Sequence, residues 1–142
     1  MLKIYICLLI LSISNLANSK DSNHYLDSID PLWKWSRVCP SDKTPCFSGK
    51  YKKTNITAFM AAHYAPKATL TSLCDNHIKA LKKSQKIDEF IQHNNYCYWK
   101  ASGELHYMVL RKEFINIFKF STLEGHLDLA MLSSFVAKVG EK

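Results

Sequence analysis

Six histidines are the residues of this chain best suited to acid–base chemistry near neutral pH. They are His24, His63, His77, His93, His106 and His126. A ribonuclease-like hydrolase would need two of them, together with a lysine, around one phosphate group. We expect His106 on a β-hairpin and His63 or His77 on a facing helix, so that one pair could meet. Because no spacing matches a recognised site, we assign no catalytic residue, and hydrolysis is the alternative function.

Other motifs that carry chemistry are absent from the sequence. There is no G-x-S-x-G, and the chain has only four glycines and no phosphate-binding glycine loop. Cys74 and His77 stand three residues apart, but the paired short spacings of structural zinc sites are missing. The sequence also lacks a C-x-x-C motif, which would have suggested redox catalysis. We therefore expect no metal and no cofactor.

Four of the five cysteines, Cys39, Cys46, Cys74 and Cys97, follow an apolar leader that contains the fifth, Cys7. An even number of cysteines in an exported chain predicts two disulfides. Four cysteines allow three pairings, and the sequence does not decide among them. We favour Cys39 with Cys46, closing a short loop, and Cys74 with Cys97, joining a helix to a strand.

The N-terminus has the features of a signal peptide. Lys3 precedes a run of about ten apolar residues, which is too short to cross a bilayer. The small residues that end at Ser19 are typical of a signal-peptidase cleavage site. We predict a signal peptide over residues 1–19 and a single mature domain over 20–142, of which 20–30 are loose. Cleavage would leave 123 of the 142 residues. It would also remove Lys3, so the formal charge would fall from +7 to +6. We expect a secreted or periplasmic protein without stable membrane insertion. Asn55 begins an N-glycosylation sequon, which would be used only in a eukaryotic host.

The periodicity of apolar residues predicts helices first, then strands. Helical spacing is found in residues 31–38, 55–65 and 70–91, and residues 40–53 are rich in proline and polar residues, typical of a loop. Alternation then predicts a hairpin over 96–111, turning at Ser102-Gly103, and a third strand over 113–120. A capping box from Ser121 to Glu124 would start a C-terminal helix. The expected fold class is α+β, with N-terminal helices, a small antiparallel sheet, a C-terminal helix and two disulfides.

Basic and aromatic side chains are the remaining candidates for function. One stripe of the predicted helix carries lysines, and strand alternation places Tyr98 and Trp99 on opposite faces of the sheet. The candidate binding residues are Lys79, Lys82, Lys83, Lys86, Tyr98 and Trp99. We expect a non-catalytic binding module, such as an inhibitor, immunity or host-interaction factor. Its partner would be a macromolecule, a protein or an anionic surface polymer in preference to nucleic acid.

Overall fold

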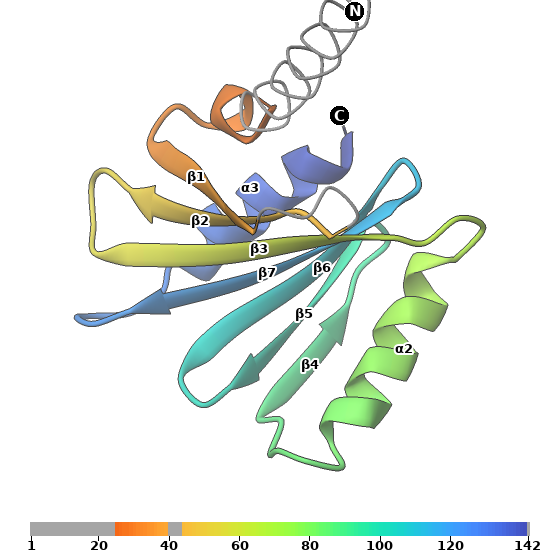
Figure 1. Cartoon of the computed structure of the whole chain (residues 1–142). Coiled ribbons are helices and arrows are strands. Elements are labelled where there is room, and N and C mark those ends of the chain that lie inside the picture. The colour runs from red at the N-terminus through yellow and green to blue at the C-terminus, as the bar shows by residue number, and fades with distance from the viewer. Residues whose placement is uncertain (1–24, 40–43, 142) are drawn as a thin grey trace, which may run out of the picture.

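A seven-stranded antiparallel sheet forms the centre of the computed structural model, which describes residues 25–39 and 44–141 (Figure 1). The strands are β1 (Trp33–Cys39), β2 (Cys46–Tyr51), β3 (Ile56–Tyr64), β4 (Glu89–Gln92), β5 (Tyr96–Ala101), β6 (Glu104–Arg111) and β7 (Phe114–Thr122). Their order across the sheet is β1-β2-β3-β7-β6-β5-β4. The chain therefore adds strands from one edge inwards, passes to the other edge at β4, and returns to the centre with β7.

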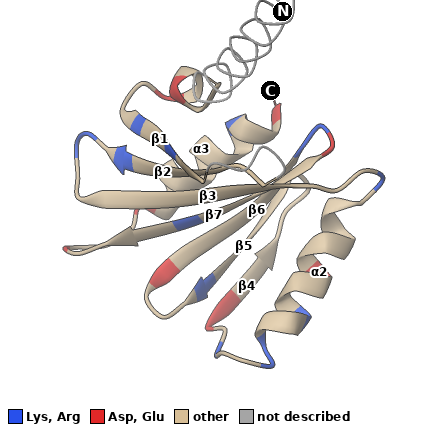
Figure 2. Ribbon diagram, in the orientation of Figure 1, with Lys and Arg blue, Asp and Glu red and all other residues tan. Residues whose placement is uncertain are grey.

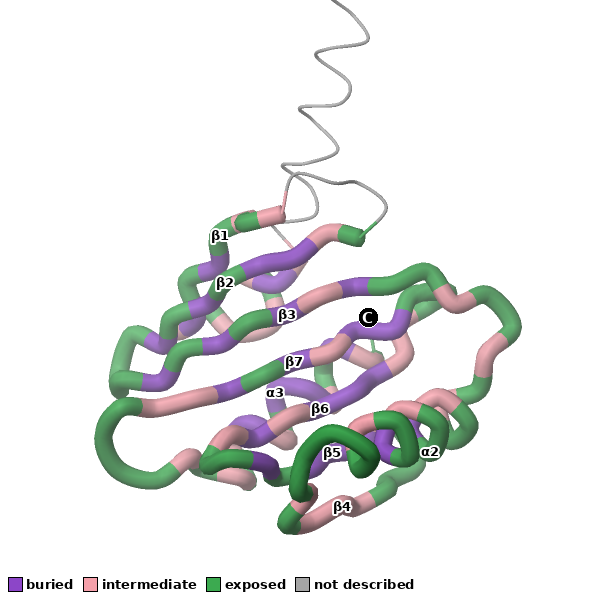
Figure 3. Tube along the Cα trace, turned by 60° about the horizontal axis from the view of Figure 1, so that its bottom comes forward, coloured by how far each residue is buried: buried purple, intermediate pink, exposed green. Residues whose placement is uncertain are grey.

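Two helices lie on opposite faces of this sheet (Figures 1 and 3). Helix α2 (Leu70–Leu81) packs beside β4, β5 and β6, and helix α3 (Leu129–Glu141) packs on the other face. A short helical segment over residues 25–29 precedes β1 and buries Leu26 completely. Each helix gives its face of the sheet a separate apolar core.

The core under α3 is built from aromatic rings. Trp33 and Trp35 of β1 stack on each other with ring centroids 5.4 Å apart, and both lie within 6.0 Å of the Phe135 ring of α3. Phe118 and Phe120 of β7 meet the same phenyl ring edge-on. Because alternate residues of a strand point to one face, the inward positions of β1 and β7 form one continuous aromatic layer.

The core under α2 is smaller and contains a disulfide. Cys74 and Ile78 of α2 are buried against Trp99 of β5 and Met108 of β6. Cys74 is bonded to Cys97 of β5, with their Cα atoms 6.5 Å apart. The second disulfide joins Cys39 to Cys46 across the β1–β2 connection, so the structure contains the pairing that we favoured.

The expected fold class, an α+β fold with a small hairpin sheet, is wrong. Residues 33–39 and 56–64, for which we expected helix, are strands β1 and β3, and residues 46–51, expected in a loop, are strand β2. In β3 the inward residues include Ala58 and Ala62, whose small side chains do not stand out in an apolar pattern. The three-and-four spacing of Ile56, Phe59 and Met60 was therefore read as helical, although Phe59 faces solvent.

Two helix boundaries also differ from the expectation. Helix α2 ends at Leu81, and residues 89–92, expected in the same helix, form edge strand β4. The predicted capping box from Ser121 to Glu124 does not start a helix, because β7 continues to Thr122. Helix α3 starts only at Leu129, where the Asp128 carboxylate accepts a hydrogen bond from the Met131 amide at 3.0 Å. Strands β5, β6 and β7 agree with the predicted hairpin and third strand. The expected signal peptide, 1–19, lies outside the described residues.

Candidate functional site

One half of the α2 side of the sheet is not covered by a helix. Figure 3 shows β2, β3 and β7 with no element in front of them, whereas α2 lies in front of β5. We call this surface the open face. It consists of the side chains of β1, β2, β3 and β7 that point away from α3: Lys34, Ser36, Val38, Ser48, Lys50, Thr57, Phe59, Ala61, His63, Ile117, Lys119 and Ser121.

Positive charge is concentrated at the β1–β2 end of the open face. Lys34 and Lys50 are directly opposite each other in the antiparallel ladder, an arrangement that is unfavourable for two like charges. Within the described residues, no carboxylate lies within 4.0 Å of either ammonium group. Two of the described acids lie at the border of this face: Glu104, 3.9 Å from Lys119, and Glu124, which lines a hollow together with Lys50. A row of unneutralised lysines is what a surface for an anionic partner requires.

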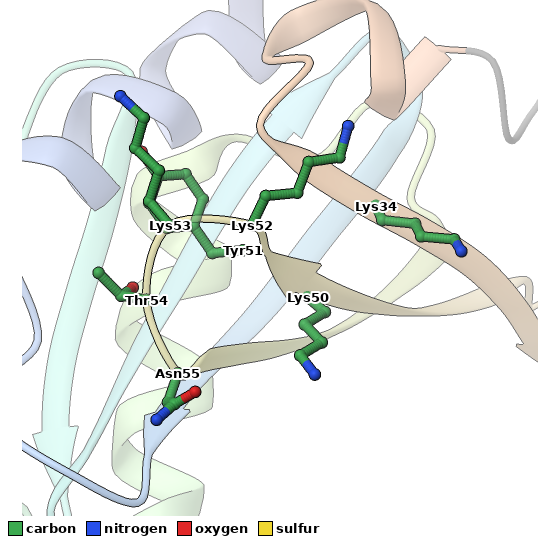
Figure 4. Close-up of a pocket in the computed structure, with 7 residues that line it drawn as sticks. All are labelled: Lys34, Lys50, Tyr51, Lys52, Lys53, Thr54 and Asn55. Carbon is green, nitrogen blue, oxygen red and sulfur yellow. The ribbon is translucent and has the colours of Figure 1, made fainter.

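A shallow hollow of about 370 Å³ lies at this end, around the β2–β3 connection (Figure 4). Lys34, Lys50, Lys52 and Lys53 line it, but their ammonium groups point outwards in different directions and do not converge. Lys52 is also held by a hydrogen bond that it donates to the Pro31 carbonyl at 2.8 Å. The arrangement therefore does not cage one small anion and suits contact with an extended surface.

The centre of the open face is apolar. Phe59 is 40% exposed although it lies in the middle of β3, between Ser48 of β2 and Lys119 of β7. Val38 of β1 is also exposed on this side. Apolar side chains surrounded by charged and hydroxyl groups are the usual composition of a protein-binding surface.

The predicted binding lysines are exposed, but they form a separate group. Lys79 lies in the last turn of α2, and Lys82, Lys83 and Lys86 follow it, so the four gather at the C-terminal end of this helix (Figure 2). Lys86 lies 3.6 Å from the Asp88 carboxylate, an exposed pair that contributes little to stability.

The predicted aromatic surface residues are inside the protein. Trp99 is 1% exposed because α2 covers it, and Tyr98 is 7% exposed in the core on the α3 side. They point to opposite faces as alternation predicts, but helices cover both faces at β5. Tyr98 and Trp99 therefore stabilise the fold and offer no exposed platform to a partner.

Comparisons of this chain with protein families, with curated proteins and with solved structures found no match. Its function must therefore be inferred from its own surfaces. In the part of the chain that the structure describes, no helix is long and apolar enough to cross a membrane.

Two histidines meet at the border between the open face and α2. The rings of His77, from α2, and His106, from β6, lie 5.1 and 5.3 Å from the Trp99 ring, and His106 stacks nearly parallel to it. Burial lowers the pKa of both imidazoles below the ordinary 6.5, and the electrostatic effects of His63 on His77 and of Lys119 on His106 lower it further. Glu104, 3.5 Å from His106, opposes this shift of the His106 pKa.

These histidines do not form an evident catalytic or metal site. The lowered pKa values favour the neutral form of both imidazoles, which can accept a proton but cannot act as a general acid. Neither ring lines the hollow around the β2–β3 connection. Among the described residues, no three histidine, cysteine or acidic side chains gather as they would around a metal ion. Of the others, His93 packs on Tyr96, and His24 lies outside the described residues.

The open face was missed by reasoning from the sequence, although its pattern is present there. Residues 33–38 alternate buried Trp33 and Trp35 with exposed Lys34 and Ser36. Had this segment been assigned as a strand, the lysine at position 34 would have been predicted on the side opposite the tryptophans. Its neighbour Lys50 depends on the pairing of β1 with β2, which local patterns do not give.

Proposed function

We propose that this chain is an exported, non-catalytic binding module whose open face docks on an acidic protein. The observation that carries the proposal is the pair Lys34 and Lys50, which stand opposite each other without a carboxylate partner among the described residues. Repulsion between the two ammonium groups lowers the stability of the free protein, and an anionic surface that binds there would relieve this repulsion. Two disulfides are consistent with an oxidising compartment and hold the framework of this surface.

A protein partner fits the open face better than an anionic polymer does. A flexible polyanion needs positive charge alone, whereas this face also exposes Phe59 in its centre. A buried aromatic anchor inside a polar rim is the arrangement that concentrates binding energy in protein interfaces. The lysines at the end of α2, Lys79, Lys82, Lys83 and Lys86, are on the same side of the sheet and would extend the contact.

The test uses charge reversal with a matched control. Immobilised oxidised protein would be exposed to extract from its native compartment, and the retained proteins would be quantified. We expect an acidic protein to be retained by the wild type and lost by the double variant Lys34→Glu/Lys50→Glu. The control is Lys112→Glu/Lys138→Glu, which changes the net charge equally. Lys138 is on α3 and Lys112 is in the β6–β7 turn, both away from the open face, so this variant should bind the partner like the wild type.

Two outcomes would contradict the proposal. Equal loss in both double variants would mean that net charge, and not the open face, governs binding. Turnover of RNA or of a cell-envelope polymer, abolished by His77→Ala or His106→Ala, would instead support the alternative, a small secreted hydrolase that uses histidine. That alternative rests on the approach of these two rings to Trp99.

A further inference from the structure

A second hollow lies on the α3 side of the sheet, opposite the open face. Its volume is about 260 Å³, and its walls are apolar: Phe47 of β2, Met60 and Ala62 of β3, and Phe114 of β7 line it. Phe47 and Met60 are paired across β2 and β3, and Ala62 is paired with Asn116 of β7. The hollow therefore lies over β2, β3 and β7, near the turn that joins β6 to β7.

The floor of this hollow contains Asn116. This asparagine is 4% exposed and is the one polar residue that is buried in the described part of the chain. It lies in the row of β7 that otherwise carries Phe118 and Phe120, and its amide makes only a long hydrogen bond of 3.4 Å to the Phe114 carbonyl. Buried side-chain amides are normally fully hydrogen-bonded, so an asparagine here calls for a partner.

The rim of the hollow contains Arg111, at the end of β6. Its guanidinium lies over the Tyr25 ring at 3.6 Å, while its Nε is buried and has no hydrogen-bond partner. No carboxylate of the described residues lies within 4.0 Å of it. Tyr25 itself is fixed by the hydrogen bond that its hydroxyl donates to the Val139 carbonyl at 3.2 Å. The arginine is thus held in place with a buried Nε–H that has no acceptor among the residues the structure describes.

We propose that this hollow binds a small molecule with an apolar chain and a carboxylate, of the size of a medium-chain fatty acid. The apolar walls would take the chain, while the guanidinium of Arg111 and the amide of Asn116 would donate hydrogen bonds to the carboxylate. Arginine is suited to this because its planar donors match the two carboxylate oxygens. Small-molecule sites generally combine apolar walls with a few polar groups.

The volume limits the length of the chain. At about 30 Å³ for each atom of water size, 260 Å³ holds about nine non-hydrogen atoms, which lies between hexanoate and octanoate. Each added methylene that becomes buried should improve the affinity about fourfold. The improvement in affinity should end once the chain fills the hollow, so dodecanoate should bind in the hollow no more tightly than octanoate.

The experiment is a titration of the oxidised wild-type protein with hexanoate, octanoate, dodecanoate and octan-1-ol, followed by calorimetry and by amide chemical shifts. We expect saturable binding of octanoate, with shifts centred on Ala62, Arg111 and Asn116, and at least tenfold weaker binding of the uncharged alcohol. This comparison needs no variant, so it holds whether or not Arg111 can be replaced without unfolding.

Variants then separate the charge from the chain. Arg111→Gln should bind octanoate and octan-1-ol equally weakly, whereas the control Lys112→Gln removes one exposed positive charge next in sequence and should bind like the wild type. Ala62→Leu, which fills the hollow, should abolish both. The proposal is overturned by the absence of saturable octanoate binding at millimolar concentration, by equal affinity for the alcohol, or by unchanged affinity in Arg111→Gln.

Discussion

Replacing Gly49 by alanine should destabilise the protein, because the indole of Trp35 occupies the space of the missing side chain. The two residues are cross-strand neighbours in β1 and β2. A Cβ added to Gly49 would lie 2.6 Å from Cζ3 of Trp35, closer than carbon atoms approach without a shift of one of them. The glycine therefore serves close packing.

The tryptophan has little room to retreat. Its ring stacks on Phe135 at a centroid distance of 6.0 Å and on Trp33 at 5.4 Å, and it meets Phe118 edge-on at 6.1 Å. Overpacking such a core costs about 1–3 kcal/mol. Loss of glycine from the unfolded chain returns about 0.4–1 kcal/mol. We expect a net loss of about 1–2 kcal/mol in the free energy of unfolding.

The assay is urea unfolding at pH 7.5, followed by far-ultraviolet circular dichroism. With a slope of about 1–3 kcal/mol per M, the midpoint should fall by about 1 M. The control is the same substitution in a Trp35→Phe background, where the ring atoms closest to Gly49 are absent. There Gly49→Ala should cost at least 1 kcal/mol less, which a double-mutant cycle measures. An equal cost in both backgrounds, or a stabilised single variant, would refute the packing argument.

Three further predictions concern the disulfides, the pH dependence and the open face. Removing the α2–β5 disulfide, with a sequence separation of 23, should cost roughly 3 kcal/mol, against roughly 2 kcal/mol for the β1–β2 bond with a separation of 7; serine pairs in urea unfolding check this. Because folding lowers the pKa of His77 and His106, the unfolded chain binds more protons below pH 6.5, so stability should fall as the pH drops from 7 to 5; substituting both by glutamine should flatten this dependence, and an unchanged slope would exclude them as its source. Phe59→Ser should leave the urea midpoint nearly unchanged, since the ring is half-exposed, but weaken capture of the acidic partner; unaltered capture would remove Phe59 from the proposed interface.

Local chemistry in the sequence was sufficient for strands β5, β6 and β7. Ser102 and Gly103 both adopt positive φ, 52° and 75°, as a two-residue hairpin turn requires, and the flanking strands alternate clearly. Lys112, with φ 54°, lies in the tight turn that joins β6 to β7. Helix α2 was likewise recognisable from its apolar stripe, although we expected the helix to continue to residue 91, beyond its end at Leu81.

The first half of the sheet could not be recognised in the same way. In β1 the pattern rests on only two inward tryptophans, next to an Asp30-Pro31 pair that resembles the start of a helix. In the structure Asp30 instead accepts a hydrogen bond from the Leu32 amide at 2.9 Å and turns the chain into β1. Strand β3 pairs with β2 on one side and with β7, about sixty residues later, on the other, so its place inside the sheet depends on a long-range contact that local preference does not give.

The open face follows from the dimensions of the sheet and the helices. Seven strands at about 4.8 Å spacing span about 29 Å, whereas a helix with its side chains is about 10 Å wide and covers about two strands. The disulfide between Cys74 and Cys97 fixes α2 over β5, so β1, β2 and β3 lie beyond its reach on that side. If the open face only contacted solvent, polar side chains without opposed like charges would be sufficient there. Lys34 and Lys50 stand opposite each other in the ladder, where like charges are unfavourable, and the acidic partner that we propose would relieve this repulsion.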